Sequence, residues 1–150
     1  MNISQSIPSN TAGGRGQLVF RVATAGGAIP LEGARVIVRS QGAEGDVNRG
    51  NALSVMYSDR NGRTPVMTLP TVPRSQSQSP QSPGVAPPFL CYDAEVFLAG
   101  YRGIEFVCIP IFDGVTSVQP ADMIPLPENG REDGFDYEKV TVVEGENPNL

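Results

Sequence analysis

The chain has 150 residues, with 17 glycines, 14 prolines, two cysteines and no histidine. This length predicts one domain, and the many Gly and Pro residues favour short strands joined by turns over long helices. The lack of histidine argues against a zinc site and against a Ser or Cys nucleophile with a histidine base.

The formal net charge of −5 is concentrated in one segment of the chain. Residues 128–150 carry all of it, whereas residues 1–127 have equal numbers of acidic and basic side chains. A neutral body has no basic stripe, so we expect no binding to nucleic acid. No apolar run is long enough for a membrane span, and residues 1–16 do not read as a signal peptide.

Hydrophobic alternation and turn residues organise the chain from residue 17 onward. Residues 1–16 are polar and Gly-rich, and predict a flexible arm. The strands that follow are predicted at residues 17–24, 35–39, 52–58, 63–69, 90–98, 104–111, 115–118 and 123–126, with a break at Pro120. Seven or eight short strands with frequent turns indicate an all-β fold, an antiparallel β-sandwich domain over residues 17–127.

The strongest hairpin signal covers residues 90–111, with a turn at Gly100 to Gly103. Alternation in its first strand predicts one set of side chains toward a core and one set mostly toward solvent. The core set is Leu90, Tyr92, Ala94, Val96 and Leu98, and the solvent set is Cys91, Asp93, Glu95 and Phe97.

The two cysteines lie one in each arm of this hairpin. A turn near Tyr101 and Arg102 puts Cys108 opposite Asp93 to Glu95, and alternation points Cys91 and Cys108 to opposite faces. We therefore expect two free thiols, with a disulfide as the alternative.

Two further segments stand outside the predicted strands. Residues 71–88 contain five prolines among Ser and Gln, and predict a solvated connection between sheets, or alternatively a partner-binding segment. Residues 128–150 form an acidic tail with one β-prone patch, Tyr137 to Val143. That patch is either a further strand of its own domain, a strand lent to a neighbour, or disordered.

The search for chemistry yields one weak cluster. Asp93 and Glu95 share a strand face, and Glu105 on the partner strand comes near them, which would suit Ca²⁺ or acid/base catalysis. A solvent-facing row of charges is the interpretation we favour. Asp59 to Gly62 predicts a plain turn rather than a calcium loop. The residues thus predict no enzyme, no cofactor and no metal.

Several short motifs occur in an order that resembles a known family. They are residues 17–22, 29–36, 58–63, 69–70 and 99–101, and their series is similar to the carboxypeptidase regulatory-like (transthyretin-like) β-sandwich, an Ig-like architecture. Residues 64–70, 111–120 and 123–127 resemble the non-catalytic N-terminal region of clostridial spore cortex-lytic enzymes. The resemblance implies an accessory module, in a spore or cell-surface setting.

The functional prediction is a non-enzymatic structural or adaptor module that associates with itself or with another surface or spore protein. The alternative is a module that binds peptidoglycan or another glycan. The candidate partner contacts are Tyr137, Val140, Val142, Val143, Tyr101, Asp93 and Glu95.

Overall fold

The computed structural model describes residues 13–41, 50–74, 89–127 and 137–142. These residues form nine strands in two sheets, which confirms the predicted all-β sandwich. The strands are β1 (Gly14–Thr24), β2 (Ile29–Pro30), β3 (Arg35–Ser40), β4 (Ala52–Tyr57), β5 (Met67–Thr71), β6 (Leu90–Phe97), β7 (Gly103–Ile111), β8 (Thr116–Met123) and β9 (Tyr137–Thr141). No helix long and apolar enough to cross a membrane occurs in these ranges.

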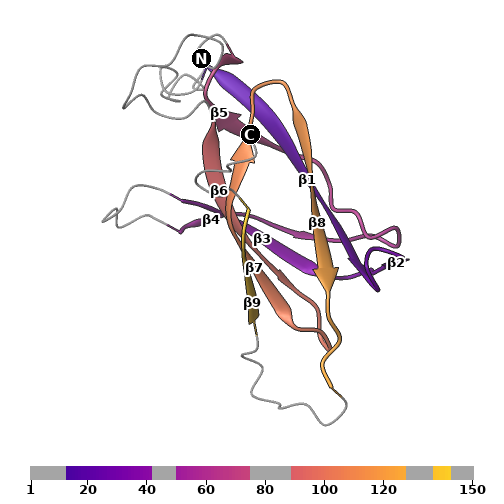
Figure 1. Ribbon diagram of the computed structural model, residues 1–150. Helices are drawn as coiled ribbons and strands as arrows, with labels where there is room; N and C mark the ends of the chain where they lie inside the picture. The colour runs from indigo at the N-terminus through magenta and orange to yellow at the C-terminus, as the bar shows by residue number, and fades with distance from the viewer. Residues whose placement is uncertain (1–12, 42–49, 75–88, 128–136, 143–150) are drawn as a thin grey trace, which may run out of the picture.

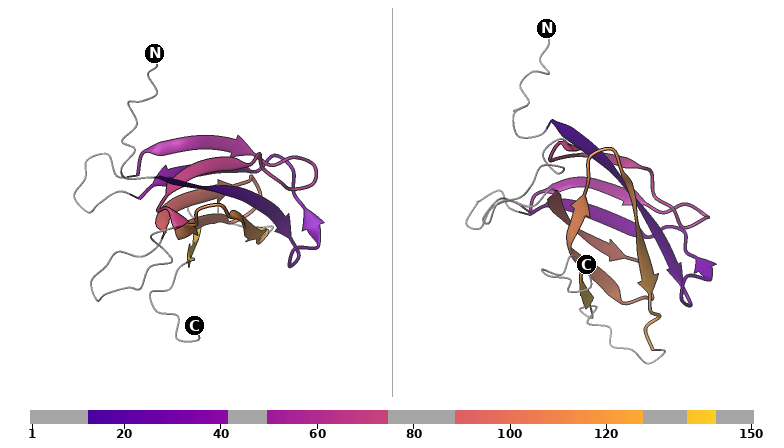
Figure 2. Two further views of the ribbon diagram at one scale, coloured as in Figure 1. Left: turned by 90° about the horizontal axis from the view of Figure 1, so that it is seen from above. Right: turned by 45° about the horizontal axis from the view of Figure 1, so that its top comes forward.

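The smaller sheet is built around β1. Along one edge β1 pairs antiparallel with β5 and β2, and along the other edge it pairs in parallel with β8. The larger sheet has the order β4-β3-β6-β7-β9, antiparallel except for β9, which runs parallel to β7. Figures 1 and 2 show β1 and β8 side by side, crossing over one face of the larger sheet. The two parallel pairings depart from the purely antiparallel arrangement that we expected.

The core lies between the sheets and follows the predicted alternation. Leu18, Phe20 and Val22 of β1 are fully buried and face β3, β6 and β7. The rings of Phe20 and Phe106 lie 6.2 Å apart between the two sheets. Of the predicted core set on β6, Tyr92, Ala94 and Val96 are buried, Leu98 is half-buried, and Leu90 at the strand start is exposed.

Tyr92 also ties the two sheets together through its polar end. Its hydroxyl donates a 2.6 Å hydrogen bond to the carbonyl oxygen of Pro70 on β5. Burial raises the pKa of this phenol above its ordinary value of 10.0, so the group stays protonated and keeps donating.

The first strand begins earlier than predicted. β1 starts at Gly14, inside the segment expected to be a flexible arm, and Gly14 to Gly16 pair with Leu69 to Thr71. The glycines are needed for close packing rather than for flexibility. A Cβ on Gly16 would overlap the carbonyl oxygen of Phe112, and one on Gly14 would lie 2.8 Å from that of Val72.

Two other strand boundaries were predicted incorrectly. The strand expected at 63–69 is found as β5, at Met67–Thr71. Before it, Arg63 forms only a single bridge, and the hydroxyl of Thr64 accepts a hydrogen bond from the Phe20 N–H in place of a regular ladder. β8 runs through Pro120 without a break. A proline is tolerated there because β8 pairs on one side only, so a missing N–H need not interrupt the ladder.

Parts of several predictions lie outside the described residues. These are most of the arm (1–12), most of the Pro-rich loop (75–88), the loop 42–49, and Val143 with the rest of the tail.

Candidate functional site

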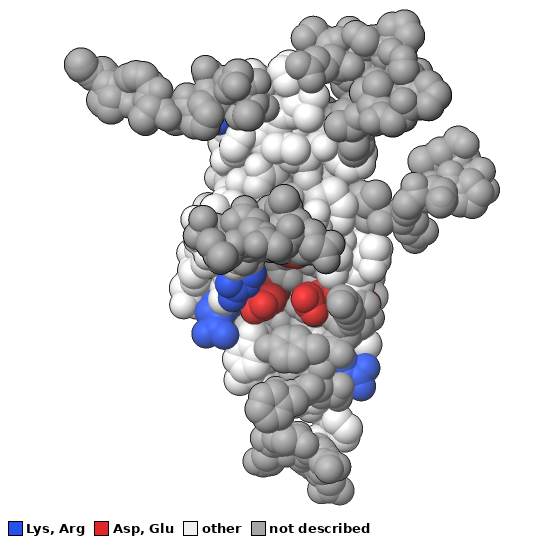
Figure 3. Space-filling view, turned by 90° about the vertical axis from the view of Figure 1, so that its left-hand side faces the viewer, with Lys and Arg blue, Asp and Glu red and all other residues white. Residues whose placement is uncertain are grey.

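The predicted row of acidic side chains lies on the outer face of the larger sheet. Glu95 on β6 and Glu105 on β7 are direct cross-strand neighbours. Arg39 on β3 compensates this like-charge pair, because its Nε lies 3.4 Å from a Glu95 carboxylate oxygen. The backbone register places Lys139 of β9 beside Glu105 on the other flank. Figure 3 shows acidic side chains together on one side of the molecule, with basic side chains next to them.

Asp93 has a different role from these two glutamates. Its Oδ1 accepts the backbone N–H of Cys108 (2.9 Å) and a Gln41 side-chain N–H (3.0 Å), and it sits where the β6–β7 register shifts. Asp93 is therefore a structural anchor of a β-bulge. Within the described ranges, no three metal-ligating groups come together.

The expectation of free thiols was wrong: Cys91 and Cys108 form a disulfide, with their Cα atoms 4.5 Å apart. Tyr92 pairs with Ile109, but Ala94 pairs with Phe106, so β7 has two residues where β6 has one. Cys108 occupies this bulge with a positive φ of 63°. The bulge resets the alternation, so that Cys108 and Cys91 share the outer face.

The strand predicted in the tail pairs within its own chain. Val140 and Val142 of the β9 region are half-buried against the core, and the Val142 N–H donates to the Val107 carbonyl oxygen (2.9 Å). Tyr101, also half-buried, pairs with Pro125. These three residues thus make intramolecular contacts. The side chain of Tyr137 and the whole of Val143 lie outside what the structure describes.

The length of the connection between β8 and β9 is consistent with the pairing of β9 with β7 of the same chain. The Leu126 N–H bonds to the Gly100 carbonyl oxygen, so the exit of β8 lies close to Gly103, where β9 begins its pairing. The nine residues 128–136 join these two points. Such a length bridges so short a gap without difficulty, since an extended chain covers about 3.3 Å per residue.

Two turn carboxylates stabilise the scaffold around these strands. Asp59 Oδ1 accepts the backbone N–H groups of Arg63 (3.0 Å) and Asn61 (2.8 Å), which lowers the pKa of Asp59. Asp113 accepts those of Arg74 (2.8 Å) and Arg15 (3.1 Å), which lowers its pKa likewise. The segment Asp59 to Gly62 is therefore a hydrogen-bonded turn.

An exposed apolar row on β4 is a feature that the sequence analysis did not single out. On β4, an edge strand of the larger sheet, Leu53, Val55 and Tyr57 are 47%, 51% and 59% exposed. Val55 lies beside Ile37 of β3, and Tyr57 beside Arg35, whose guanidinium stacks over Phe97 at 5.4 Å. The sequence contained a signal for this row, because the residues on both faces of β4 are largely apolar. Of these residues, only Met56 packs in the core.

The main chain of β4 is also available at this edge. The Ser58 N–H bonds to the Ala34 carbonyl oxygen, so Ser54 and Met56, on the same side of the register shift at Leu53, direct their main-chain groups to β3. Val55 and Tyr57 therefore direct theirs away from the sheet. Within its bounds β4 has no charged residue and no proline, two of the usual protections of an edge strand, but its ladder with β3 shifts register at Leu53.

No family model and no curated protein matches the chain. Among solved structures, the Bacillus anthracis TIE protein is similar at 15% identity and a TM-score of 0.46, over 75% of this chain and 17% of that one. Catechol 1,2-dioxygenase from Acinetobacter radioresistens is similar at 13% identity and a TM-score of 0.47, over 89% of this chain and 59% of that one. A mutant of that dioxygenase is similar at 12% identity and a TM-score of 0.49. The chain thus spans less than two thirds of each of these proteins, and at these values the likenesses carry no argument about function.

Proposed function

We propose that the chain is a non-enzymatic structural or adaptor module that associates with a second copy of itself through the β4 edge. The observation that carries this proposal is the exposed, uncharged row of Leu53, Val55 and Tyr57 on a strand whose outer edge pairs with no other described strand. An apolar edge without charge is a template for pairing with another strand.

A two-fold axis at Val55 gives the most favourable pairing. In an antiparallel arrangement, Val55 faces Val55 of the second copy, and Leu53 faces Tyr57. Apolar side chains then meet apolar side chains, and no like charges are brought opposite one another within β4. The register also fits the main chain, because no other described strand pairs with the N–H and C=O groups that Val55 and Tyr57 direct to this edge. The contact is isologous and closes at a dimer, joining two larger sheets into one.

The setting that we propose is a spore or cell surface. It rests on the resemblance to the carboxypeptidase regulatory-like domain and to the accessory region of spore cortex-lytic enzymes. The Cys91–Cys108 disulfide supports it, because such bonds persist in oxidising surroundings and are rare in a reducing cytosol.

The strand-lending version of association has less support than the β4 edge. β9 pairs with β7 of its own chain, and Val140 and Val142 pack on their own core. The glycan-binding alternative rests on Asp93, Glu95 and Tyr101, all of which make intramolecular contacts. Sedimentation with purified cell-wall sacculi tests that alternative, and no pelleting above a control protein would reject it.

The β4 proposal is tested by placing a charge at its centre. Val55→Lys should convert the dimer to a monomer, because two ammonium groups would face each other across the axis. Val118→Lys is the matched control: Val118 is 49% exposed and lies on β8, an edge strand of the other sheet. It should leave the dimer intact. Equal masses for both variants in solution would overturn the proposal.

A further inference from the structure

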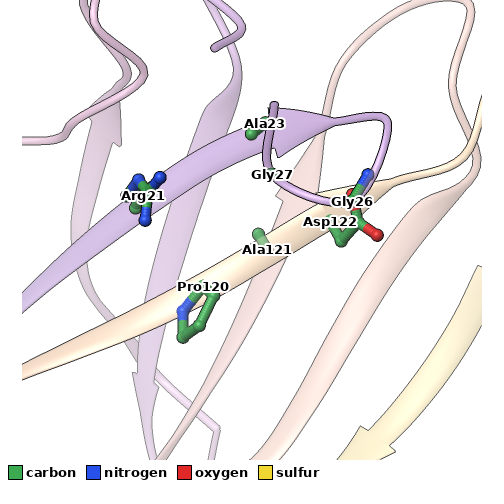
Figure 4. A pocket seen from close by; sticks show the side chains of 7 residues that line it. All are labelled: Arg21, Ala23, Gly26, Gly27, Pro120, Ala121 and Asp122. Carbon is green, nitrogen blue, oxygen red and sulfur yellow. The ribbon is translucent and has the colours of Figure 1, made fainter. Parts of the chain in front are cut away.

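The outer face of the smaller sheet contains an open cavity of about 260 Å³, far from β4. Its lining comes from β1 (Arg21, Ala23), from the turn after β1 (Gly26, Gly27) and from β8 (Pro120 to Asp122) (Figure 4). Nothing in the association of β4 edges involves these residues, so the cavity calls for an explanation of its own.

The cavity has a cationic end and an anionic end. Figure 4 shows Arg21 and Asp122 at opposite ends, with the small side chain of Ala23 between them. Ala121 pairs with Val22 and belongs to the core on the other face of the sheet. Both charged side chains are exposed, whereas Ala23 between them is almost fully buried. The floor is thus apolar, and opposite charges stand at its two ends.

Arg21 has no anionic partner among the residues that the structure describes. The ion pair found in those ranges joins Arg39 and Glu95 on the other sheet. On the side away from β8, the cross-strand neighbour of Arg21 is Arg63, a second cation. Like charges directly opposite one another on a sheet are unfavourable, and an anion bound there would compensate them.

The anionic end is fixed by an unusual turn. Asp122 Oδ1 accepts the backbone N–H of Gly26 at 3.2 Å, which orients the carboxylate. In this turn Ala25, Gly26 and Gly27 all have positive φ, of 57°, 67° and 94°. For Ala25 that backbone conformation is unfavourable because of its Cβ, and such residues cluster at binding sites.

We infer that this cavity binds a short peptide with a free carboxylate and a free ammonium group. The carboxylate accepts hydrogen bonds from Arg21, and the ammonium group donates to Asp122. Arg21 pairs with Pro120, and Asp122 follows two residues along β8, so the Arg21 and Asp122 Cα atoms are displaced by about 7 Å along the strands and by about 4.8 Å across them. An extended dipeptide spans about 7 Å between its charged ends, whereas the two charges of a single α-amino acid lie closer together.

The test is an amide-resolved NMR titration of the full chain with the dipeptide alanyl-alanine. We expect saturable shifts at Arg21, Ala23, Gly26, Gly27 and Asp122. Arg21→Gln should weaken binding about tenfold or more, because it removes a charge-assisted hydrogen bond. Arg35→Gln, the same change on β3 of the other sheet, should leave the affinity unchanged.

Capped probes decide which charges the cavity recognises. The N-acetylated dipeptide and the C-terminal amide should each bind more weakly than the free dipeptide. Equal binding of either capped form, no shift at these amides, or shifts that survive Arg21→Gln would overturn the inference. The readout is independent of the β4 proposal, since Val55→Lys should change the mass of the particle and leave this titration as it is.

Discussion

Gly62 is the residue on which the turn between β4 and β5 depends most. Its φ is +79°, and an added Cβ would overlap the carbonyl oxygen of Val22 on β1. Gly62→Ala should therefore lower the free energy of unfolding by about 3 kcal/mol, from the left-handed backbone and the overlap together. Gly100→Ala is the matched control: φ is +90° with no atom near the added Cβ, so we expect a loss of about 1 kcal/mol. Urea unfolding measures both, and equal losses would show that the overlap is relieved.

The carboxylate of Asp113 should make the fold sensitive to acid. Hydrogen bonds from the backbone N–H groups of Arg74 and Arg15 hold the pKa of Asp113 below its ordinary value of 3.8. Because the pKa of Asp113 is lower in the folded state than in the unfolded state, its ionised carboxylate stabilises the fold. This stabilisation is complete above pH 3.8 and is lost as the pH falls through the lowered pKa.

Asp113→Asn should therefore lower the melting temperature at neutral pH and reduce its further fall below pH 3.8. Circular dichroism melting curves across the acid range measure this. Asp59, whose pKa is also lowered, remains in the variant and keeps part of the acid dependence. Parallel curves for the two proteins would show that Asp113 does not contribute.

Among the elements, the β6–β7 hairpin carries the covalent link. The cysteines are 17 residues apart, and a loop of this length stabilises the fold by about 3 kcal/mol through the unfolded state. The double variant Cys91→Ser with Cys108→Ser should lose this amount in urea unfolding. A thiol assay on the unreduced, unfolded chain is the check on the bond itself. Two free thiols per chain would contradict it.

The same hairpin shows how far a sequence pattern determines an element. The alternation of Tyr92, Ala94 and Val96 predicted the buried face correctly, because one buried face imposes a period of two. The disulfide was missed because alternation assumes an unbroken ladder. The bulge at Cys108 depends on the side chain of Asp93 capping its N–H, a contact that no periodicity reveals.

Strand ends were predicted less well than strand interiors. The Gly14 to Gly16 stretch was taken for an arm since glycine is common in mobile segments. Its actual role appears only when Phe112 and Val72 are packed against it. Likewise Pro120 marks a break only in a strand paired on both sides, and the sequence alone does not say that β8 is an edge.

At the scale of the whole molecule, the all-β sandwich was predictable and the candidate interface was not. Turn spacing and alternation fix the fold class, because they decide how many apolar faces must be covered. The exposure of Leu53, Val55 and Tyr57 depends on β4 lying at the edge of its sheet, which is a property of strand order. Val140 and Val142 were predicted as partner contacts because they are apolar. Their apolar side chains instead pack against the core of their own chain.

The most direct test of the account is the absolute mass in solution, by light scattering, of the full chain, of Val55→Lys and Val118→Lys, and of a chain that ends at Pro127. We predict a dimer for the full chain, for Val118→Lys and for the shortened chain, and a monomer for Val55→Lys. A monomeric full chain, or a dimer that survives Val55→Lys but is lost on removal of residues 128–150, would contradict association through β4.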